Sequence, residues 1–262
     1  MHHPRLTFRL LIYGFSLLVP LLAPGQTVHL SDTQADKIGR RLWQNECGGT
    51  IAGLTSWNTG ENFASLGIGH FIWYPVGQRG PFEESFPPLV AYLKGSGVTL
   101  PEWLAAAHGC PWSDRAAFLA DLHSARLQEL RTILSGTVSL QARFAANRLE
   151  AALPKMLAVL PPDAQAKVRH NFDRVAATPN GMYPLVDYVN FKGEGTSPTE
   201  RYKGEGWGLL QVLAAMKEGP ALEQFRIAAD EVLTRRVHSA PPERHEERWL
   251  PGWRNRVRTY GE

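Results

Sequence analysis

A glutamate that ends a helical pattern is the most chemically suggestive residue of the chain. Glu46 follows a segment whose apolar residues have helical spacing, and it lies just before Gly48 and Gly49. A carboxyl group at a helix end beside a hairpin is well placed on the wall of a cleft, where Trp43 and Cys47 would limit its exposure and raise its pKa. A carboxylic acid with a raised pKa can donate a proton near neutral pH. Glu46 is therefore a candidate general acid, and the alternative is a solvated carboxylate at the helix end.

Three further polar residues, Glu61, Ser65 and His70, follow within the next segment. A second carboxylate across a cleft from Glu46 would orient water or stabilise a developing positive charge, and paired carboxylates of this kind hydrolyse glycosidic bonds. Glu61 is the nearest acidic residue for that role, and a plain loop charge is the alternative. For Ser65 and His70 the alternatives are a hydroxyl that pairs within the hairpin and a hydrogen-bonded structural histidine.

The elements that would position these residues follow from local signals. Ser31 and Gln34 form a capping box, and the helix that they open should end near the glycine pair. Residues 50–75 lack helical spacing and predict turns and one small hairpin closed by Pro75. The fold class is therefore α+β, mainly helical, with one small β-hairpin near the N-terminus. Beyond the hairpin, helix starts are expected near Glu83, Pro101, Ser113, Ser139, Pro162, Leu185, Trp207, Ala221 and Pro241.

A second segment, residues 187–211, combines aromatic and polar residues with glycines. Aromatic rings stack on the apolar faces of sugars, while amide and carboxylate groups bind sugar hydroxyls. The segment therefore favours carbohydrate binding, and its Glu194, Glu200 and Glu205 are reserve candidates for a second carboxylate. The alternative is a packed glycine-rich turn held by ion pairs. The expected substrate-binding residues are Trp57, Tyr188, Asn190, Glu194, Glu205, Trp207 and Gln211.

The hairpin reads Ser-Leu-Gly-Ile-Gly-His over residues 65–70, and it follows a helix that ends at Glu46. Over about residues 38–74 this arrangement resembles the phage-type lysozymes, or endolysins, whose hairpin carries Ser/Thr-x-Gly-Ile-Gly-His. The resemblance implies a lysozyme-like helical body in which Glu46 is the catalytic acid and Ser65 orients water. By the same resemblance His70 supports the site, together with Gly67 and Gly69. The implied partner is a β-linked aminosugar polymer, with peptidoglycan as the expected substrate.

The resemblance departs at the second carboxylate, because Thr59 stands where the family has an aspartate. A weaker likeness lies in Gly-Trp-Arg-Asn-Arg at residues 252–256, since endolysins often carry a Gly-x-x-x-Arg-Arg-like element near their end. Gly-Trp-Gly-Leu-Leu-Gln at residues 206–211 resembles the Gly-Leu-Met-Gln element of lytic transglycosylases and goose-type lysozymes. Three hypotheses follow: a glycan hydrolase, a non-catalytic cell-wall-binding module, and a lytic transglycosylase, which needs only one catalytic acid.

The start of the chain has the pattern of a secretory signal peptide. Arg5 and Arg9 precede an apolar run over residues 10–22, and small, turn-forming residues follow. Such a run is too short to span a bilayer comfortably as a helix. We expect a signal peptide over residues 1–25, with an uncleaved anchor as the alternative. We expect a single domain over residues 26–262 that is periplasmic or secreted.

The net charge indicates which partners to exclude, and the cysteine content raises the question of a disulfide. The formal net charge is +3 at pH 7 and falls closer to zero once the leader is removed, so a nucleic-acid partner is not expected. No later stretch is apolar enough for a membrane span, and no motif points to a metal or another cofactor. The two cysteines, Cys47 and Cys110, would pair in an oxidising compartment, and two separate buried thiols are the alternative.

Overall fold

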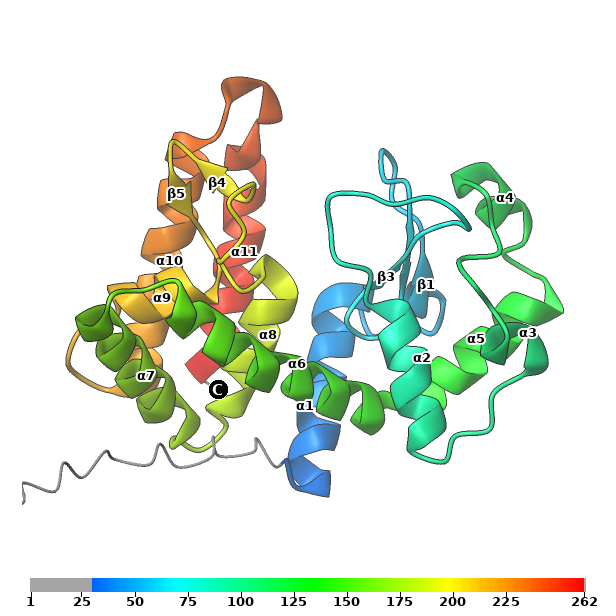
Figure 1. Cartoon of the computed structure of the whole chain (residues 1–262), viewed down its shortest axis with the longest axis horizontal. Coiled ribbons are helices and arrows are strands. Elements are labelled where there is room, and N and C mark those ends of the chain that lie inside the picture. The colour runs from blue at the N-terminus through cyan, green and yellow to red at the C-terminus, as the bar shows by residue number, and fades with distance from the viewer. Residues whose placement is uncertain (1–29, 262) are drawn as a thin grey trace, which may run out of the picture.

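The computed structural model describes residues 30–261, which form two lobes bridged by two helices (Figure 1). The bridging helices are α1 (Asp32–Cys47) and α6 (Val138–Ala158). The sheet lobe comprises η1 (Ala52–Leu54), β1 (Thr55–Ser56), β2 (Ala64–Leu66), β3 (Phe71–Trp73), α2 (Phe86–Gly95), α3 (Glu102–Ala105), α4 (Arg115–Ala120) and α5 (Ala125–Gly136). The helical lobe comprises α7 (Pro162–Ala176), α8 (Met182–Lys192), β4 (Arg201–Tyr202), β5 (Glu205–Gly206), α9 (Leu209–Ala215), α10 (Ala221–Ser239), η2 (Pro242–Arg244), η3 (Glu246–Trp249), α11 (Leu250–Arg258) and η4 (Thr259–Gly261).

Helix α1 forms because its local signals agree with its packing. The Ser31 hydroxyl accepts a hydrogen bond from the Gln34 backbone, and the Gln34 side chain accepts one from the Ser31 backbone. These bonds satisfy N–H groups that the start of a helix leaves open. Ile38 lies on the buried face, and α1 packs along α6. Gly48, at φ +60°, ends the helix in the left-handed conformation that glycine adopts without strain, so Glu46 lies in the last turn.

The sheet is small and antiparallel, with strand order β1-β2-β3. Ser65 in the central strand pairs with Ile72 in β3. Residues 67–70 make the tight turn between β2 and β3, where the His70 backbone N–H donates to the Gly67 carbonyl over 3.2 Å. The sequence predicts one hairpin here, and the structure adds the short strand β1 to it.

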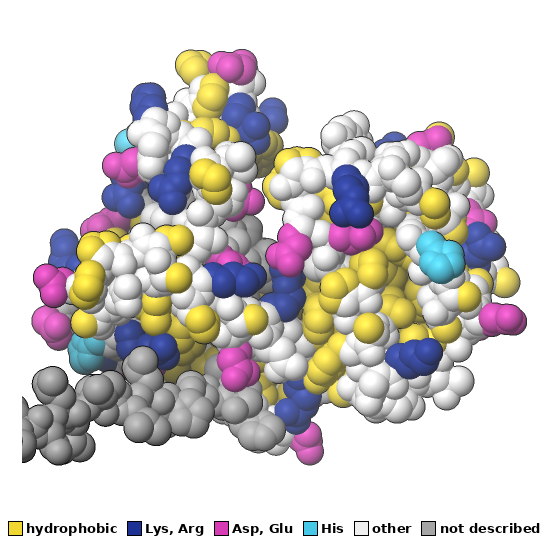
Figure 2. Space-filling model, viewed as in Figure 1, with side chains coloured by type: hydrophobic (Ala, Val, Ile, Leu, Met, Phe, Trp, Pro, Cys, Tyr) yellow, Lys and Arg dark blue, Asp and Glu magenta, His cyan; other side chains and the backbone are white. Residues whose placement is uncertain are grey.

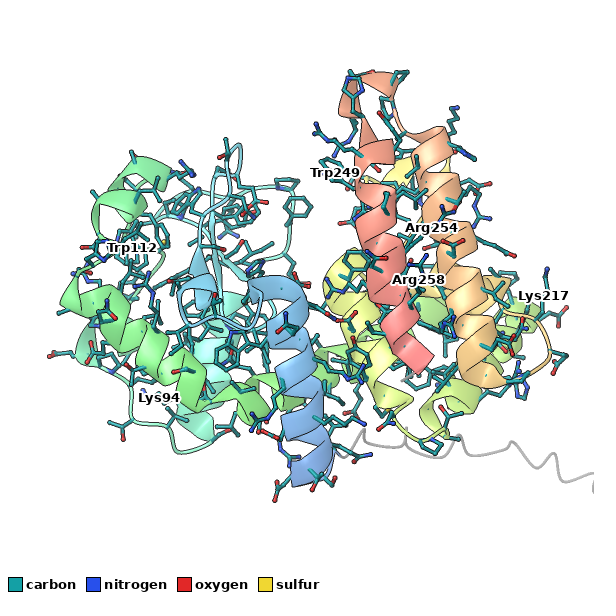
Figure 3. All side chains as sticks on the ribbon, turned by 180° about the vertical axis from the view of Figure 1, so that it is seen from behind. Lys94, Trp112, Lys217, Trp249, Arg254 and Arg258 are labelled. Atoms are coloured by element: carbon teal, nitrogen blue, oxygen red, sulfur yellow. The ribbon has the colours of Figure 1, made fainter. Side chains whose placement is uncertain are left out.

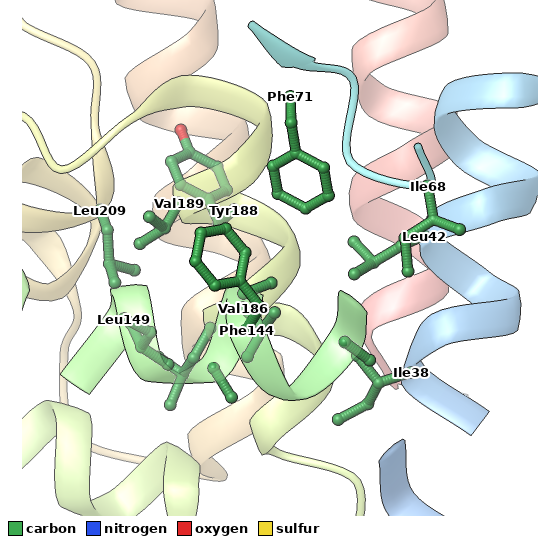
Figure 4. Packing of buried hydrophobic residues seen from close by; sticks show 14 of the residues in the cluster. Ile38, Leu42, Ile68, Phe71, Phe144, Leu149, Val186, Tyr188, Val189 and Leu209 are labelled. Atoms are coloured by element: carbon green, nitrogen blue, oxygen red, sulfur yellow. The ribbon is translucent and has the colours of Figure 1, made fainter. Parts of the chain in front are cut away.

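Buried apolar side chains from both lobes form one continuous cluster (Figure 4). Phe144 of α6 packs edge-on against Phe71 of β3, with ring centroids 5.4 Å apart. The cluster also includes Leu42 of α1 and Val186 of α8. Because burial of apolar surface stabilises whatever arrangement achieves it, this shared core holds the lobes against the bridging helices.

The prediction of a mainly helical α+β fold with a small sheet in its N-terminal part is confirmed. The local patterns miss helix α5, strand β1 and the two-stranded β4–β5 hairpin in the glycine-rich stretch after α8. The helix start expected near Pro241 is instead a short 3-10 turn, Pro242–Arg244, and helix α11 begins at Leu250. The expected signal peptide lies outside the described residues. Within residues 30–261, no helix combines the length and the hydropathy that crossing a bilayer would require.

Candidate functional site

The Glu46 carboxylate lies at the junction of the two lobes, where side chains from three other elements meet it. Asn190 of α8 donates to Glu46 Oε1 over 3.1 Å, and Arg256 of α11 donates to the same oxygen over 2.6 Å. His70 Nδ1, at the β2–β3 turn, lies 3.7 Å from Glu46 Oε2. The Glu46 side chain is 16% exposed, so it is largely enclosed yet still reached by solvent.

Arg256 is fixed by a carboxylate that is more deeply buried than Glu46. Its Nε and Nη2 atoms each donate to Asp187 over 2.8 Å, and the Asp187 side chain has no exposed surface. Tyr260 Oη and Asn45 Nδ2 also donate to Asp187, over 2.6 and 3.1 Å. Although burial acts to lower it, the carboxylates of Asp187 and Glu46 hold the pKa of Arg256 well above its usual range. One guanidinium group therefore links two carboxylates, and Asp187 orients it.

The β2–β3 turn packs tightly against α6 and α8. Gln141 of α6 is fully buried, and its side chain accepts a hydrogen bond from the Ile68 backbone over 2.9 Å. A Cβ atom placed on Gly69 would lie 2.8 Å from Asn190 Oδ1, closer than real Cβ contacts come. A glycine is therefore required where the turn meets the side chain that binds Glu46.

His70 ends this turn at φ +48°, in the left-handed region that residues other than glycine seldom adopt. Burial lowers the pKa of His70 below its usual value, although nearby Glu46 acts to raise it. The imidazole is therefore mostly neutral at pH 7. At that pH the charged partner of Glu46 is Arg256 rather than His70.

Replacing Gly69 with alanine is expected to lower the free energy of unfolding by about 1–3 kcal/mol, because the methyl group would overlap Asn190 and the Phe71 ring. It should also impair any reaction at Glu46, since Asn190 binds that carboxylate. Urea unfolding measures the first effect. Gly95→Ala is the matched control, because open space surrounds Gly95 at the end of α2 and the change should be neutral or stabilising. Equal stability of the two variants would contradict the close packing of the turn.

The other predicted residues of the sheet lobe lie in or beside its sheet. Ser65 is buried in the central strand, and Glu61 accepts a hydrogen bond from Asn58 over 3.1 Å in the β1–β2 connection. Burial raises the pKa of Glu61 above its usual value. Trp57 is buried and donates its indole N–H to the Glu61 carbonyl. In the part of the chain that the structure describes, none of these predicted residues makes a polar contact with Glu46.

The second polar segment contributes Asn190 and the buried Asp187 to the site, and several of its other residues hold the segment together. Asn190 binds Glu46, as described above. Tyr188 is fully buried and donates its hydroxyl to the Trp207 carbonyl over 3.1 Å. Gln211 ties two glycine-rich stretches together through its side-chain amide. The structure therefore brings only part of this segment to the Glu46 carboxylate.

The acidic residues predicted in this segment form ion pairs elsewhere. Glu194 lies 3.4 Å from Lys155 of α6. Glu205 in β5 lies 2.5 Å from Arg235 of α10. Among residues 30–261, neither glutamate makes a polar contact with the Glu46 carboxylate.

Both cysteines are buried and free, so of the two alternatives the structure has two separate thiols and not a disulfide. Cys47 directs its Sγ atom to the Gly67 carbonyl, 3.4 Å away. The Cys110 backbone N–H donates to the Tyr74 carbonyl over 2.8 Å, next to β3. Each cysteine is thus packed against a different part of the sheet lobe. Burial raises the pKa of each thiol to about 12.

The network behind Glu46 is the part of the site that the sequence leaves unassigned. Arg256 belongs to the element likened to the end of endolysins, which is the one signal that points to it. Asp187 lies at the start of the second polar segment, and Tyr260 lies near the end of the chain, and no motif gives either residue a role.

Figure 2 shows a notch between the two lobes, and Glu46 with its partners connects elements from both of them. The Glu46 carboxyl group is held in place by a guanidinium and an amide and is still reached by solvent, so it is placed to exchange a proton with a bound molecule. Comparisons with known protein families, with curated proteins and with solved structures find no match for this chain.

Proposed function

We propose that the chain is an exported, lysozyme-like enzyme that cleaves a β-linked aminosugar polymer, with peptidoglycan as the expected substrate and Glu46 as the general acid. The observation that carries this proposal is the enclosed carboxylate of Glu46 at the junction of the lobes, bound by Arg256 and Asn190. Its position between a long first helix and the Gly-Ile-Gly-His turn supports the resemblance to phage-type lysozymes. The signal-like start of the sequence supports a periplasmic or secreted location.

The two carboxylate oxygens of Glu46 have different surroundings, and these indicate how the acid would act. Oε1 accepts hydrogen bonds from Asn190 and Arg256. Among the described residues, Oε2 is approached only by His70, at 3.7 Å. Oε2 is therefore the oxygen that would carry the proton and deliver it to the leaving glycosidic oxygen as the bond from that oxygen to C1 breaks.

A lytic transglycosylase is the second candidate, because it needs no second carboxylate. Within residues 30–261, the groups that contact Glu46 are all basic or neutral. Thr59 occupies the position where the family resemblance expects an aspartate. Asp187 is too enclosed to act on a substrate, since its side chain has no exposed surface and is occupied by Arg256 and Tyr260. One acid suffices when a hydroxyl of the sugar itself attacks C1 in place of water.

Digestion of purified peptidoglycan by the exported chain tests the function. We expect soluble fragments, and mass analysis of their ends separates the two reactions: reducing ends indicate hydrolysis and 1,6-anhydro ends indicate transglycosylation. Intact glycan that still pulls the protein into the pellet would indicate a wall-binding module and would overturn the enzymatic proposal.

A further inference from the structure

Lys192, the last residue of α8, places its ammonium group against two aromatic rings. Its Nζ atom lies 3.6 Å from the ring centroid of Trp253 and 4.0 Å from that of Phe191. Cation–π contacts of this kind attract the charged form of the amine. Among residues 30–261, no carboxylate lies within ion-pair distance of this amine, although Glu46 and Glu246 are near enough to influence it.

The arginines near Lys192 already have their counter-ions. Arg256 binds the two carboxylates described above. Arg236 of α10 binds the buried Glu246 through hydrogen bonds of 2.7 and 2.9 Å. In the described part of the chain, the Lys192 amine thus has no carboxylate within ion-pair distance, and an incoming anion would supply the counter-ion of its charged form.

Two tryptophans form an apolar track beside this amine. Trp249 and Trp253 are four residues apart at the start of α11, a spacing that puts them on the same helix face. Their ring centroids are 6.2 Å apart, and Trp249 is 39% exposed. Figure 3 shows Trp249 at the start of α11, on the side that faces the sheet lobe. Trp249 therefore lies on the helical-lobe side of the notch, and Trp253 follows it one turn along the same face of α11.

The track leads to the Glu46 site. The Phe191 ring contacts both Lys192 and Arg256, whose guanidinium carbon lies 4.2 Å from the ring centroid. Arg256 in turn binds Glu46. If one sugar unit of a glycan strand stacked on the tryptophans, the following units of that strand would therefore lie close to Glu46.

We propose that Trp249, Trp253 and Lys192 form a subsite that selects an acidic sugar unit of the glycan. The tryptophan rings stack on the apolar face of the sugar, and the Lys192 ammonium pairs with its carboxylate. This subsite rests on the proposed glycan-cleaving function and adds a preference to it: carboxylated strands bind in the notch better than neutral strands.

The preference should strengthen as the pH falls. Burial, together with Arg236 and Arg256, lowers the pKa of Lys192 to about 6, while Glu246 and Glu46 act to raise it. Lys192 is therefore mostly neutral at pH 7.5 and mostly charged at pH 5.5. A bound carboxylate favours the charged amine, so binding near pH 7 should take up a proton from solution.

The test measures binding to the exported chain carrying Glu46→Gln, which prevents cleavage during titration. The probes are peptide-free glycan strands with free lactyl carboxylates and the same strands after carboxyl amidation. At pH 5.5 we expect the carboxylated strands to bind about five- to tenfold more tightly, the size of one partly buried charge pair. Adding Lys192→Met should abolish that preference, whereas Lys192→Arg should retain it.

Lys94→Met is the matched control, because Lys94 is exposed on α2 of the sheet lobe, away from α11 (Figure 3). It should leave the preference unchanged. Equal affinity for the two kinds of strand, a preference that survives Lys192→Met, or no binding of either strand would overturn the subsite. Failure of the enzymatic function has a different signature: the chain with Glu46 intact would leave the strands uncut while the Lys192-dependent preference persists.

Discussion

Replacing Glu46 with glutamine is expected to slow glycan cleavage by about 10²–10⁴-fold, the usual contribution of a general acid. Glutamine keeps the length of the side chain, and its carbonyl oxygen can still accept hydrogen bonds from Asn190 and Arg256, so the fold should persist. What is lost is the carboxyl proton that would pass to the leaving oxygen. The measurement is the rate at which soluble fragments leave peptidoglycan, with thermal unfolding to confirm that the variant is folded.

Variants at two other glutamates show whether the loss of activity is specific to Glu46. Glu102→Gln makes the same chemical change at the exposed first residue of α3 and should leave the rate unchanged. Glu61→Gln tests the second carboxylate; because Glu61 binds Asn58, we expect a smaller loss than at Glu46. A comparable loss would instead support a hydrolase with two carboxylates. Undiminished cleavage by Glu46→Gln would remove Glu46 as the acid and end the proposed mechanism.

One half of the site, Glu46 at the end of α1 and the β2–β3 turn, is predictable from the sequence because each part depends on residues that are close together along the chain. A capping box and a glycine stop define α1, and they place Glu46 in its last turn without help from the rest of the chain. The β2–β3 turn is equally local, since Gly67 adopts φ +74° there. Arg256, by contrast, lies 210 positions from Glu46. Only the packing of the helical lobe brings the two together, and no short pattern encodes that packing.

The elements that the local patterns miss also show that short sequence patterns do not encode every element of the fold. Helix α5 is separated from α6 only by Thr137, so the two run together in the sequence. The strands β4 and β5 have two residues each, too short for an alternating pattern. Their hairpin is supported by packing against α10, where the guanidinium carbon of Arg236 lies 4.1 Å from the Trp207 ring centroid. Burial also overrides residue type: Trp57 has a ring suited to sugar stacking, yet it lies in the core.

Replacing Asp187 with alanine is expected to lower the free energy of unfolding by about 3 kcal/mol, the low end of the cost of breaking a buried ion pair. Asp187 is fully buried, and its removal leaves Arg256, which is only 10% exposed, with Glu46 as its remaining carboxylate. It also leaves the hydroxyl of buried Tyr260 without its acceptor. Because the change reorients the guanidinium that holds Glu46, cleavage should fall as well, even at temperatures where the variant is fully folded.

Asp230→Ala is the matched control for this result, because it also removes the carboxylate partner of an arginine on α11, in a pair that is open to solvent: Asp230 of α10 binds Arg254 of α11. Asp230 lies 2.6 Å from Arg254, and the two side chains are 44% and 41% exposed. Solvent screens a pair of this kind, so its loss should cost about 0–1 kcal/mol. Guanidinium chloride unfolding of both variants measures the difference. If Asp187→Ala were as stable as Asp230→Ala, Asp187 could not be the anchor of Arg256, and the placement of Glu46 would have to depend on Asn190 and the β2–β3 turn alone.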